Sequence, residues 1–246
     1  MGIVVIIAAG LLLVPPQHTA IATTSVDVDA SPAVDGPLRC DVLIAGGSTA
    51  ALSTALTSAV AEPTLTTCLT EPTDELGGQL AFNPAIDYGI APAQPSKEWA
   101  SLVAAVTDAR APCWVSKSCY RPARLADWVR GRLATLRNLH VLLRTTVRGA
   151  IREPGGRVTA LRLVTRTPLS HDHEWDGRLS DTLADWYSPN QSQDFAKHVR
   201  TINATVVVEA SELGDVLATA GLPHTQGVEV PSETSTSTDD SISQSI

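Results

Sequence analysis

The sequence has few of the groups that hold nucleic acids or metals. Its 18 Lys and Arg residues are outnumbered by 26 Asp and Glu, and the net charge is −8. No basic block or basic–aromatic stripe occurs, so a general nucleic-acid binder is not expected. The four cysteines include no CxxC pair, and the six histidines are not clustered near them. The sequence therefore predicts no zinc or iron–sulfur site.

A long hydrophobic run is also missing. The only extended apolar stretch covers residues 3–14, which is shorter than the roughly 20 residues that a membrane-spanning helix needs. Its length is typical of the hydrophobic region of a signal peptide, although no Lys or Arg precedes it. Residues 20–22, Ala-Ile-Ala, fit a cleavage pattern. We therefore predict a signal peptide over 1–22 and a secreted or extracytoplasmic chain without a stable membrane span. An uncleaved anchor or a core strand is the alternative.

Composition divides the rest of the chain. Residues 23–37 are rich in Ser, Thr, Asp and Pro and are predicted to be a linker. Residues 231–246 have almost nothing apolar to bury and are predicted to be disordered. Apolar residues make up 43% of the whole chain, which is enough for a real core. The folded domain is expected over 38–230.

The start of that domain has the pattern of a βαβ unit. Residues 41–45 are a short apolar run, typical of a buried parallel strand. Residues 49–60 are Ala, Leu, Ser and Thr almost throughout, which predicts a helix capped by Ser48 or Thr49. A second strand is expected over 64–70. Strand, tight turn, helix and strand within about thirty residues predict the unit.

The remaining patterns complete an α/β domain. Apolar residues at helical spacing predict two helices, and alternating runs joined by a Gly-rich turn predict a β-hairpin. The expected elements are helices over 98–110 and 124–136, hairpin arms over 138–151 and 156–166, an irregular polar stretch over 169–200 anchored by aromatics such as Trp186, and a strand and short helix within 204–223. The predicted fold class is α/β, with a Rossmann-like parallel sheet and an inserted β-hairpin or meander.

The turn after the first strand resembles a dinucleotide-binding loop. Such loops place a pyrophosphate at the N-terminus of the first helix, where backbone N–H groups and the helix dipole stabilise negative charge. The three glycines of G-x-G-x-x-G correspond to Gly46, Ser48 and Ala51, so only the first is intact. Ala51 adds one methyl group to a helix–strand contact. Ser48 adds a Cβ near the phosphate, together with a hydroxyl that can donate to a phosphate oxygen.

Glu71 strengthens this interpretation. It lies 20 residues after Ala51, at the end of the second predicted strand. An acidic side chain at this place accepts hydrogen bonds from an adenosine ribose, and it would repel a 2′-phosphate. The alternative is that Glu71 merely caps a strand at the surface.

Four segments in order resemble a known family. They are "DVLIAGGSTAALSTAL", "CLTEPTDELGGQL", "CWVSKSCYRP" and "VVVEASELGDVLATAGLP". Together they resemble secreted members of the FAD-dependent oxidoreductase family, the glutathione-reductase-like flavoproteins. The resemblance covers the N-terminal part of that family's length, so the fold is expected to be a truncated FAD/NAD(P)-binding type.

The resemblance implies roles for particular residues. The turn would line the FAD pyrophosphate, the acidic residue would bind the adenosine ribose, and a Gly-Gly loop would pass the flavin side. These cofactor-binding residues are Gly46, Gly47, Ser48, Thr49, Ala50, Glu71, Gly77, Gly78 and Gln79. The hairpin would be the β-meander of the FAD domain.

The expected function is that of an FAD-binding oxidoreductase with flavin-mediated hydride or electron transfer. The small-molecule substrate and the electron acceptor are not identified by the sequence. No catalytic residue is predicted, because His140, His198 and His224 are scattered, and no metal is expected. Two alternatives stay open: a truncated, non-catalytic remnant, or an NAD-binding domain. Cys113 and Cys119 could close a small disulfide loop, although the pairing cannot be derived from sequence.

Overall fold

The computed structural model describes four stretches of the chain, residues 39–82, 97–107, 119–169 and 179–224. The predicted signal peptide, linker and C-terminal tail lie outside these stretches, so their assignments stay predictions. Within the described stretches, no helix is both long and apolar enough to cross a membrane.

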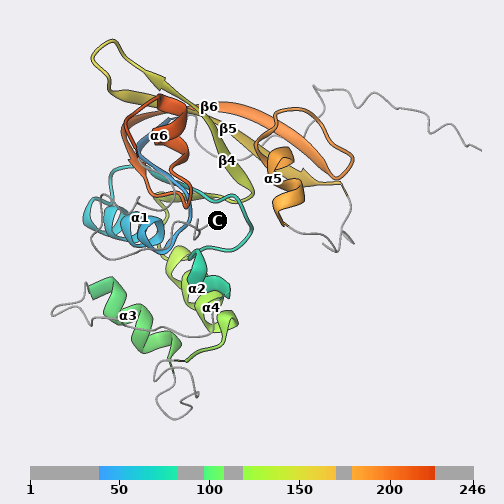
Figure 1. Cartoon of the computed structure of the whole chain (residues 1–246). Coiled ribbons are helices and arrows are strands. Elements are labelled where there is room, and N and C mark those ends of the chain that lie inside the picture. Colours follow the sequence, from blue (N-terminus) through green and yellow to red (C-terminus); the bar gives the residue numbers. More distant parts are fainter. Residues whose placement is uncertain (1–38, 83–96, 108–118, 170–178, 225–246) are drawn as a thin grey trace, which may run out of the picture. The chain divides into compact units, whose positions relative to one another are not determined.

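A strand–helix–strand unit forms where the sequence predicts it (Figure 1). Strand β1 (Arg39–Ala45) leads through a turn into helix α1 (Thr49–Ala61), and strand β2 (Thr67–Thr70) follows. β2 starts later than predicted because the residues before it form a turn, in which Leu65 N–H donates to the Glu62 carbonyl. All four side chains of β2 are buried, as is usual for a parallel strand covered on both faces.

The strands form one sheet in the order β3-β2-β1-β6-β5-β4. Strands β3 (Leu139–Leu142), β2, β1 and β6 (Phe195–Glu209) are parallel neighbours, which is a Rossmann-like arrangement. Strands β4 (Thr145–Arg152) and β5 (Val158–Pro168) are antiparallel and join the sheet through β6. The predicted α/β class, a parallel sheet with an inserted β-meander, is confirmed.

The first arm of the predicted hairpin is two strands, so that detail of the prediction is wrong. β3 belongs to the parallel sheet, and only β4 pairs with β5. Arg144 between them has a φ of 51°, a left-handed conformation that interrupts a strand. Its N–H donates to the Thr73 carbonyl at 2.7 Å, and the Thr145 N–H donates to the Glu71 carbonyl at 2.8 Å. These two hydrogen bonds connect the start of the meander to the segment that follows β2.

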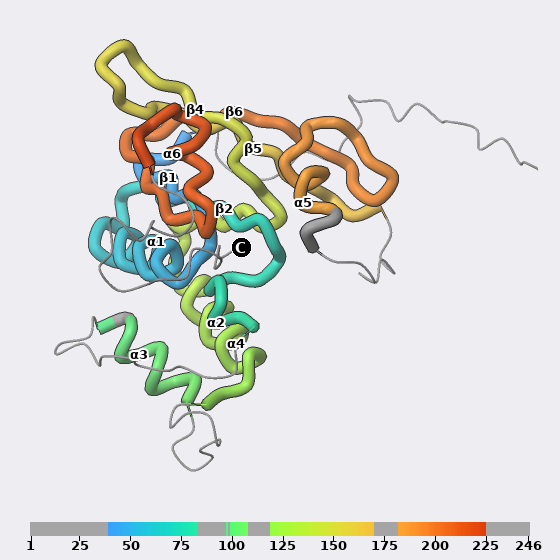
Figure 2. Tube along the Cα trace, in the orientation of Figure 1, coloured from blue at the N-terminus to red at the C-terminus, as the bar shows by residue number. Residues whose placement is uncertain are grey.

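The polar stretch over 169–200 contains a helix that the sequence did not predict. Helix α5 (Leu179–Tyr187) lies between β5 and β6, and Figure 2 shows this part of the chain path. β6 begins at Phe195, earlier than predicted. Its first part pairs with β5, its second part pairs with β1, and Asn203 is paired in both ladders. The expected aromatic anchor Trp186, on α5, is only 6% exposed.

Three of the other four described helices agree with the sequence patterns, whereas the fourth begins at Gln79, which is predicted to belong to the Gly-Gly loop. Pro122 occupies the first turn of its helix, where proline needs no hydrogen-bonded N–H. Gly221, with a φ of 62°, ends the last one as predicted. These helices are α2 (Gln79–Phe82), α3 (Lys97–Val106), α4 (Pro122–Leu133) and α6 (Asp215–Ala220).

Two hydrophobic clusters cover the two faces of the parallel strands. Adjacent residues of β1 alternate between them, because successive side chains of a strand point to opposite faces. Ile44 packs in the cluster of α1, α3 and α4, whereas Leu43 packs with residues of β4, β5 and α6. Both clusters hold the carboxyl ends of β1, β2 and β6 in place, and the candidate site lies at these ends.

A buried disulfide joins β1 to β2 within the second cluster. Cys40 and Cys68 are fully buried, and their Cα atoms are 6.0 Å apart. The sequence did not reveal this pair, because the two strands become neighbours only in the folded sheet. Cys119 is also disulfide-bonded, whereas Cys113 lies outside the described residues, so the predicted pairing of these two stays a prediction.

We expect a Cys40→Ala/Cys68→Ala variant to lose about 3 kcal/mol of unfolding free energy, because the disulfide restricts the unfolded chain. Urea unfolding followed by tryptophan fluorescence would measure this change. The single variants serve as controls, since each should lose at least as much as the double variant. Equal stability of the oxidised wild type and the double variant would contradict a structural role for this disulfide.

Candidate functional site

The turn between β1 and α1 requires glycine at its first position. Gly46 has a φ of 94°, which side-chain-bearing residues rarely adopt. Its N–H donates to Thr70 Oγ1 at 3.0 Å. A Cβ on Gly46 would lie 2.4 Å from the Ser211 Cα, so the turn also touches the backbone that follows β6. The ends of β1, β2 and β6 therefore meet at this glycine.

Ser48 caps α1, as predicted, but its hydroxyl has a different role from the one expected. The Ser48 Oγ accepts a hydrogen bond from the Ala51 N–H at 3.2 Å. The same hydroxyl donates to the Ala210 carbonyl at 2.7 Å. Its hydrogen is used within the protein instead of pointing to a phosphate, so Ser48 joins α1 to the end of β6.

The Gly-Gly loop packs directly on this turn. Gly77 N–H donates to the Gly47 carbonyl at 2.8 Å, and Thr49 Oγ1 donates to the Gly77 carbonyl at 3.0 Å. Gly78 has a φ of 55°, and a Cβ built on it would lie 3.1 Å from the Ser48 Cα. The Gly46-Gly47 and Gly77-Gly78 segments thus form one continuous backbone surface at the N-terminus of α1.

Glu71 lies beside the turn with its carboxylate buried. The residue is 6% exposed, so it is not a surface cap of β2. Its Oε1 accepts hydrogen bonds from the Thr73 N–H at 2.6 Å and the Thr73 hydroxyl at 2.7 Å. A Cβ on Gly47 would lie 2.1 Å from the Glu71 Oε2, and the Gly47 N–H interacts with the carboxylate. Glycine at position 47 is what allows this approach.

The site is acidic. Burial raises the pKa of Glu71, the hydrogen bonds from Thr73 lower it, and the nearby charge of Glu212 raises it. A Cβ on Gly78 would lie 2.4 Å from the Glu212 Oε1, which places this second carboxylate over the Gly-Gly loop. Glu209, at the end of β6, accepts hydrogen bonds from the backbone beyond it, including the Val216 N–H at 2.5 Å.

One side chain of β5 contacts the segment after Glu71, and two polar side chains of α5 and α6 are bonded to each other. The Tyr187 O–H donates to Asp215 Oδ2 at 2.8 Å, which joins α5 to α6. Burial, followed by the charge of Asp215, raises the pKa of Tyr187, and burial also raises the pKa of Asp215. Arg166 is 3% exposed, and its Nη2 donates to the Pro72 carbonyl. Burial lowers the pKa of Arg166 to about 10, so it remains a cation at neutral pH.

The structure brings most of the predicted residues together. Gly47 contacts the Glu71 carboxylate and the Gly77-Gly78 loop, Thr49 bonds to that loop and Ser48 lies against it. Gly46 contacts Thr70 and the backbone after β6 instead. Ala50 and Gln79, by contrast, are exposed. No group of His, Cys, Asp and Glu suited to a metal occurs among the described residues.

Sequence reasoning missed several residues around the site. Arg166 lies in no quoted segment. Thr70 and Asp215 lie within two of the quoted segments, but no role is predicted for their side chains, and Tyr187 is predicted only as an aromatic anchor of the polar stretch. Thr70 was placed in a strand, and its position directly before Glu71 was the one available signal. The other three come from segments far apart in the chain, which only the fold brings near Glu71.

The described residues can accept hydrogen bonds from ligand hydroxyls at Glu71 and can stabilise a phosphate at the N-terminus of α1, but they offer no obvious acid–base pair. Glu71 presents two carboxylate oxygens at the carboxyl edge of the parallel strands, where such folds bind ligands. The backbone at the N-terminus of α1 can stabilise a phosphate. His140 and His198, on strands of the sheet, form no cluster with these groups.

No protein-family model and no curated protein matches the chain. Similar solved structures include THI4 of Thermovibrio ammonificans (TM-score 0.45, 16% identity, 74% of this chain, 61% of that one). Another is the polycyclic ketone monooxygenase of Thermothelomyces thermophila (0.43, 16%, 77% and 26%). A third is the myxobacterial halogenase CndH, a variant of FAD-dependent halogenases (0.37, 16%, 71% and 38%). This chain spans less than two thirds of the length of each of these proteins. All three TM-scores are below 0.5, so no function is assigned from these similarities.

Proposed function

We propose that this protein binds FAD and that it is an oxidoreductase acting on a small molecule. The observation that carries this proposal is the Glu71 carboxylate, buried against Gly47 at the N-terminus of α1. A carboxylate there can accept two hydrogen bonds from the adjacent hydroxyls of an adenosine ribose. The same carboxylate would repel a 2′-phosphate.

The residues present fit the adenosine diphosphate part of such a cofactor. Gly46 and Gly47 let the Ser211 backbone and the Glu71 carboxylate approach the turn closely, and the turn leads into the N-terminus of α1, where a pyrophosphate can be stabilised. The Gly77-Gly78 loop, packed on the turn, favours FAD over NAD as the dinucleotide. When bound, a flavin supplies the hydride or electron transfer, and the chain's own residues bind and orient it.

A specific observation favours a second candidate, a remnant that binds no cofactor. Glu212 Oε1 lies close to Gly78 and its charge acts on Glu71. A pyrophosphate carries negative charge, and a like charge nearby disfavours it. If the Glu212 side chain keeps this position, FAD binding is weak.

A titration with FAD distinguishes the two candidates. The full chain is purified, and its visible spectrum is recorded before and after gel filtration with added FAD. Retained flavin absorption supports the proposal, and competition by NAD tests the choice of dinucleotide. A colourless protein whose tryptophan fluorescence does not change when FAD is added would favour the second candidate, a remnant that binds no cofactor.

We also propose an extracytoplasmic location. The Cys40–Cys68 disulfide supports it, because disulfides persist mainly in oxidising compartments. Fractionation of expressing cells, with immunoblotting of each fraction, would test this location. A chain found only in the reducing cytosol would contradict it.

A further inference from the structure

Arg166 is a buried cation whose guanidinium group is only partly hydrogen-bonded within the described residues. It is 3% exposed, yet it keeps its charge at neutral pH. Its Nε and Nη1 atoms have no hydrogen-bond partner within the described part of the chain. An unpaired polar atom in an interior costs free energy, so such a group calls for a reason beyond packing.

Aromatic rings compensate part of this cost. The guanidinium carbon lies 3.8 Å from the centroid of the Trp186 ring and 5.3 Å from that of Phe195. A planar guanidinium stacks well on such rings, which a lysine ammonium cannot do in the same way. The ionisable groups that act on Arg166 are Asp185, Tyr187 and Asp74, which favour the cation, and Arg144, which opposes it.

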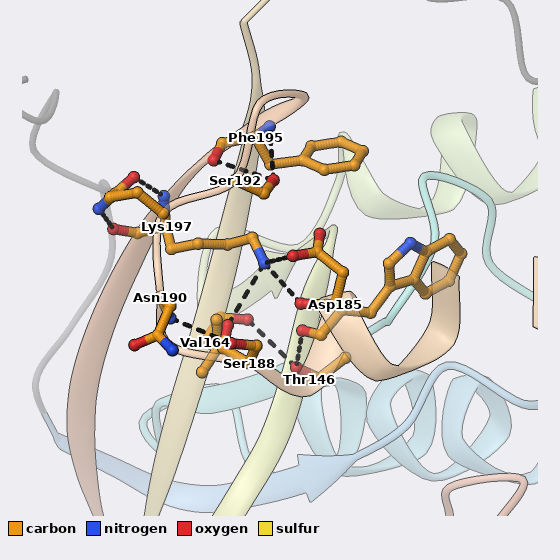
Figure 3. Close-up of polar contacts among 10 residues, drawn as sticks. Thr146, Val164, Asp185, Ser188, Asn190, Ser192, Phe195 and Lys197 are labelled. Atoms are coloured by element: carbon orange, nitrogen blue, oxygen red, sulfur yellow. Dashed lines mark hydrogen bonds and ion pairs between the residues drawn. The ribbon is translucent and has the colours of Figure 1, made fainter. Parts of the chain in front are cut away.

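The helix that carries Trp186 is held firmly. Lys197 Nζ lies 3.0 Å from Asp185 Oδ1 and donates to the carbonyls of Asp185 at 2.5 Å and Ser188 at 3.3 Å (Figure 3). Thr146 Oγ1 donates to the Trp186 carbonyl at 3.0 Å. These bonds fix the C-terminal turn of α5 against β4 and β6, and they set the position of the ring under Arg166.

The hydrogen bond of Arg166 leads toward the candidate site. Its acceptor is the carbonyl of Pro72, the residue between Glu71 and Thr73. Thr73 in turn holds Glu71 Oε1 through its N–H and its hydroxyl. A shift of the Pro72 peptide would therefore move both donors that orient the carboxylate.

We infer that Arg166 is a positioning residue that orients Glu71 toward the ribose of the bound nucleotide. The inference rests on the proposed function, since it assigns Arg166 a role in ribose recognition there. Anchored α5 holds Trp186, Trp186 holds the guanidinium, and the guanidinium holds the Pro72 carbonyl. Arg166 itself touches no ligand in this account.

The test measures discrimination at the ribose instead of affinity alone. ADP and 2′-deoxy-ADP compete with FAD for the full-length protein, and the ratio of their dissociation constants is recorded. For the wild type we expect ADP to bind at least about tenfold more tightly, since a hydrogen bond to a carboxylate is lost in the deoxy compound. In Arg166→Met the ratio should fall below about threefold, and in Arg166→Lys it should be intermediate. Thermal unfolding of each variant is recorded in parallel.

The control is Arg162→Met, which removes an exposed arginine of the same strand. It should keep the wild-type ratio. If Arg166→Met does not fold, Arg166→Lys decides the question. A wild-type ratio in a folded Arg166 variant would overturn the inference while leaving FAD binding intact. A wild type that binds neither nucleotide would instead overturn the proposed function, and the inference with it.

Discussion

A Gly46→Ala variant is expected to lose about 3 kcal/mol or more of unfolding free energy and to bind no FAD. The φ of 94° is strained for alanine, and the added Cβ would lie 2.6 Å from the Ala210 carbonyl oxygen and 2.4 Å from the Ser211 Cα. These neighbours are backbone atoms, so they cannot rotate away as a side chain could. Relief requires that the ends of β1 and β6 separate. Urea unfolding and FAD titration by fluorescence would measure the two effects.

Gly131→Ala is the matched control for this substitution. Gly131 lies within α4, and a Cβ there meets no atom within 4 Å. Alanine is a better helix former than glycine, so this variant should be as stable as the wild type or more stable by up to about 1 kcal/mol. A Gly46→Ala protein with unchanged stability and FAD binding would show that the turn does not have the close approach described here.

The features that the sequence predicted well depend on residues that are close together in the sequence. The apolar run of β1, the small residues of α1 and the cap Ser48 lie within one continuous stretch. The acidic residue at the end of β2 follows from the length of the βαβ unit. Local patterns of this kind determine which of these elements form, whereas β2 begins three residues later than predicted.

The features that the sequence did not predict depend on distant contacts. The left-handed Arg144 divides β3 from β4 because its N–H reaches the Thr73 carbonyl. Helix α5 is held by Lys197, which lies on the following strand and not on the helix. The Cys40–Cys68 disulfide and the stacking of Arg166 on Trp186 also require the folded sheet. A sequence pattern shows none of these partners.

Glu71→Gln is expected to weaken FAD binding about 10- to 100-fold, because charge-assisted hydrogen bonds to the ribose become neutral ones. Glutamine has the shape of glutamate, so Oε1 can still accept from Thr73. Its amide –NH2 group would face the Gly47 N–H, however, and because both groups are donors the hydrogen bond at this position would be lost. Glu75→Gln is the control, since Glu75 is exposed on the same loop. Equal dissociation constants for the wild type and Glu71→Gln would contradict a ribose-binding role.

The pH dependence of FAD binding gives an independent test of the same carboxylate. Burial raises the pKa of Glu71, so its carboxyl group takes up a proton at a higher pH than an exposed glutamate does. Ribose hydroxyls bind the ionised form, and binding must therefore release this proton once the pH is below the pKa. The dissociation constant should then rise by up to about tenfold for each pH unit of acidification. In Glu71→Gln this part of the slope should vanish, because no proton is left to release, and Glu75→Gln should keep it.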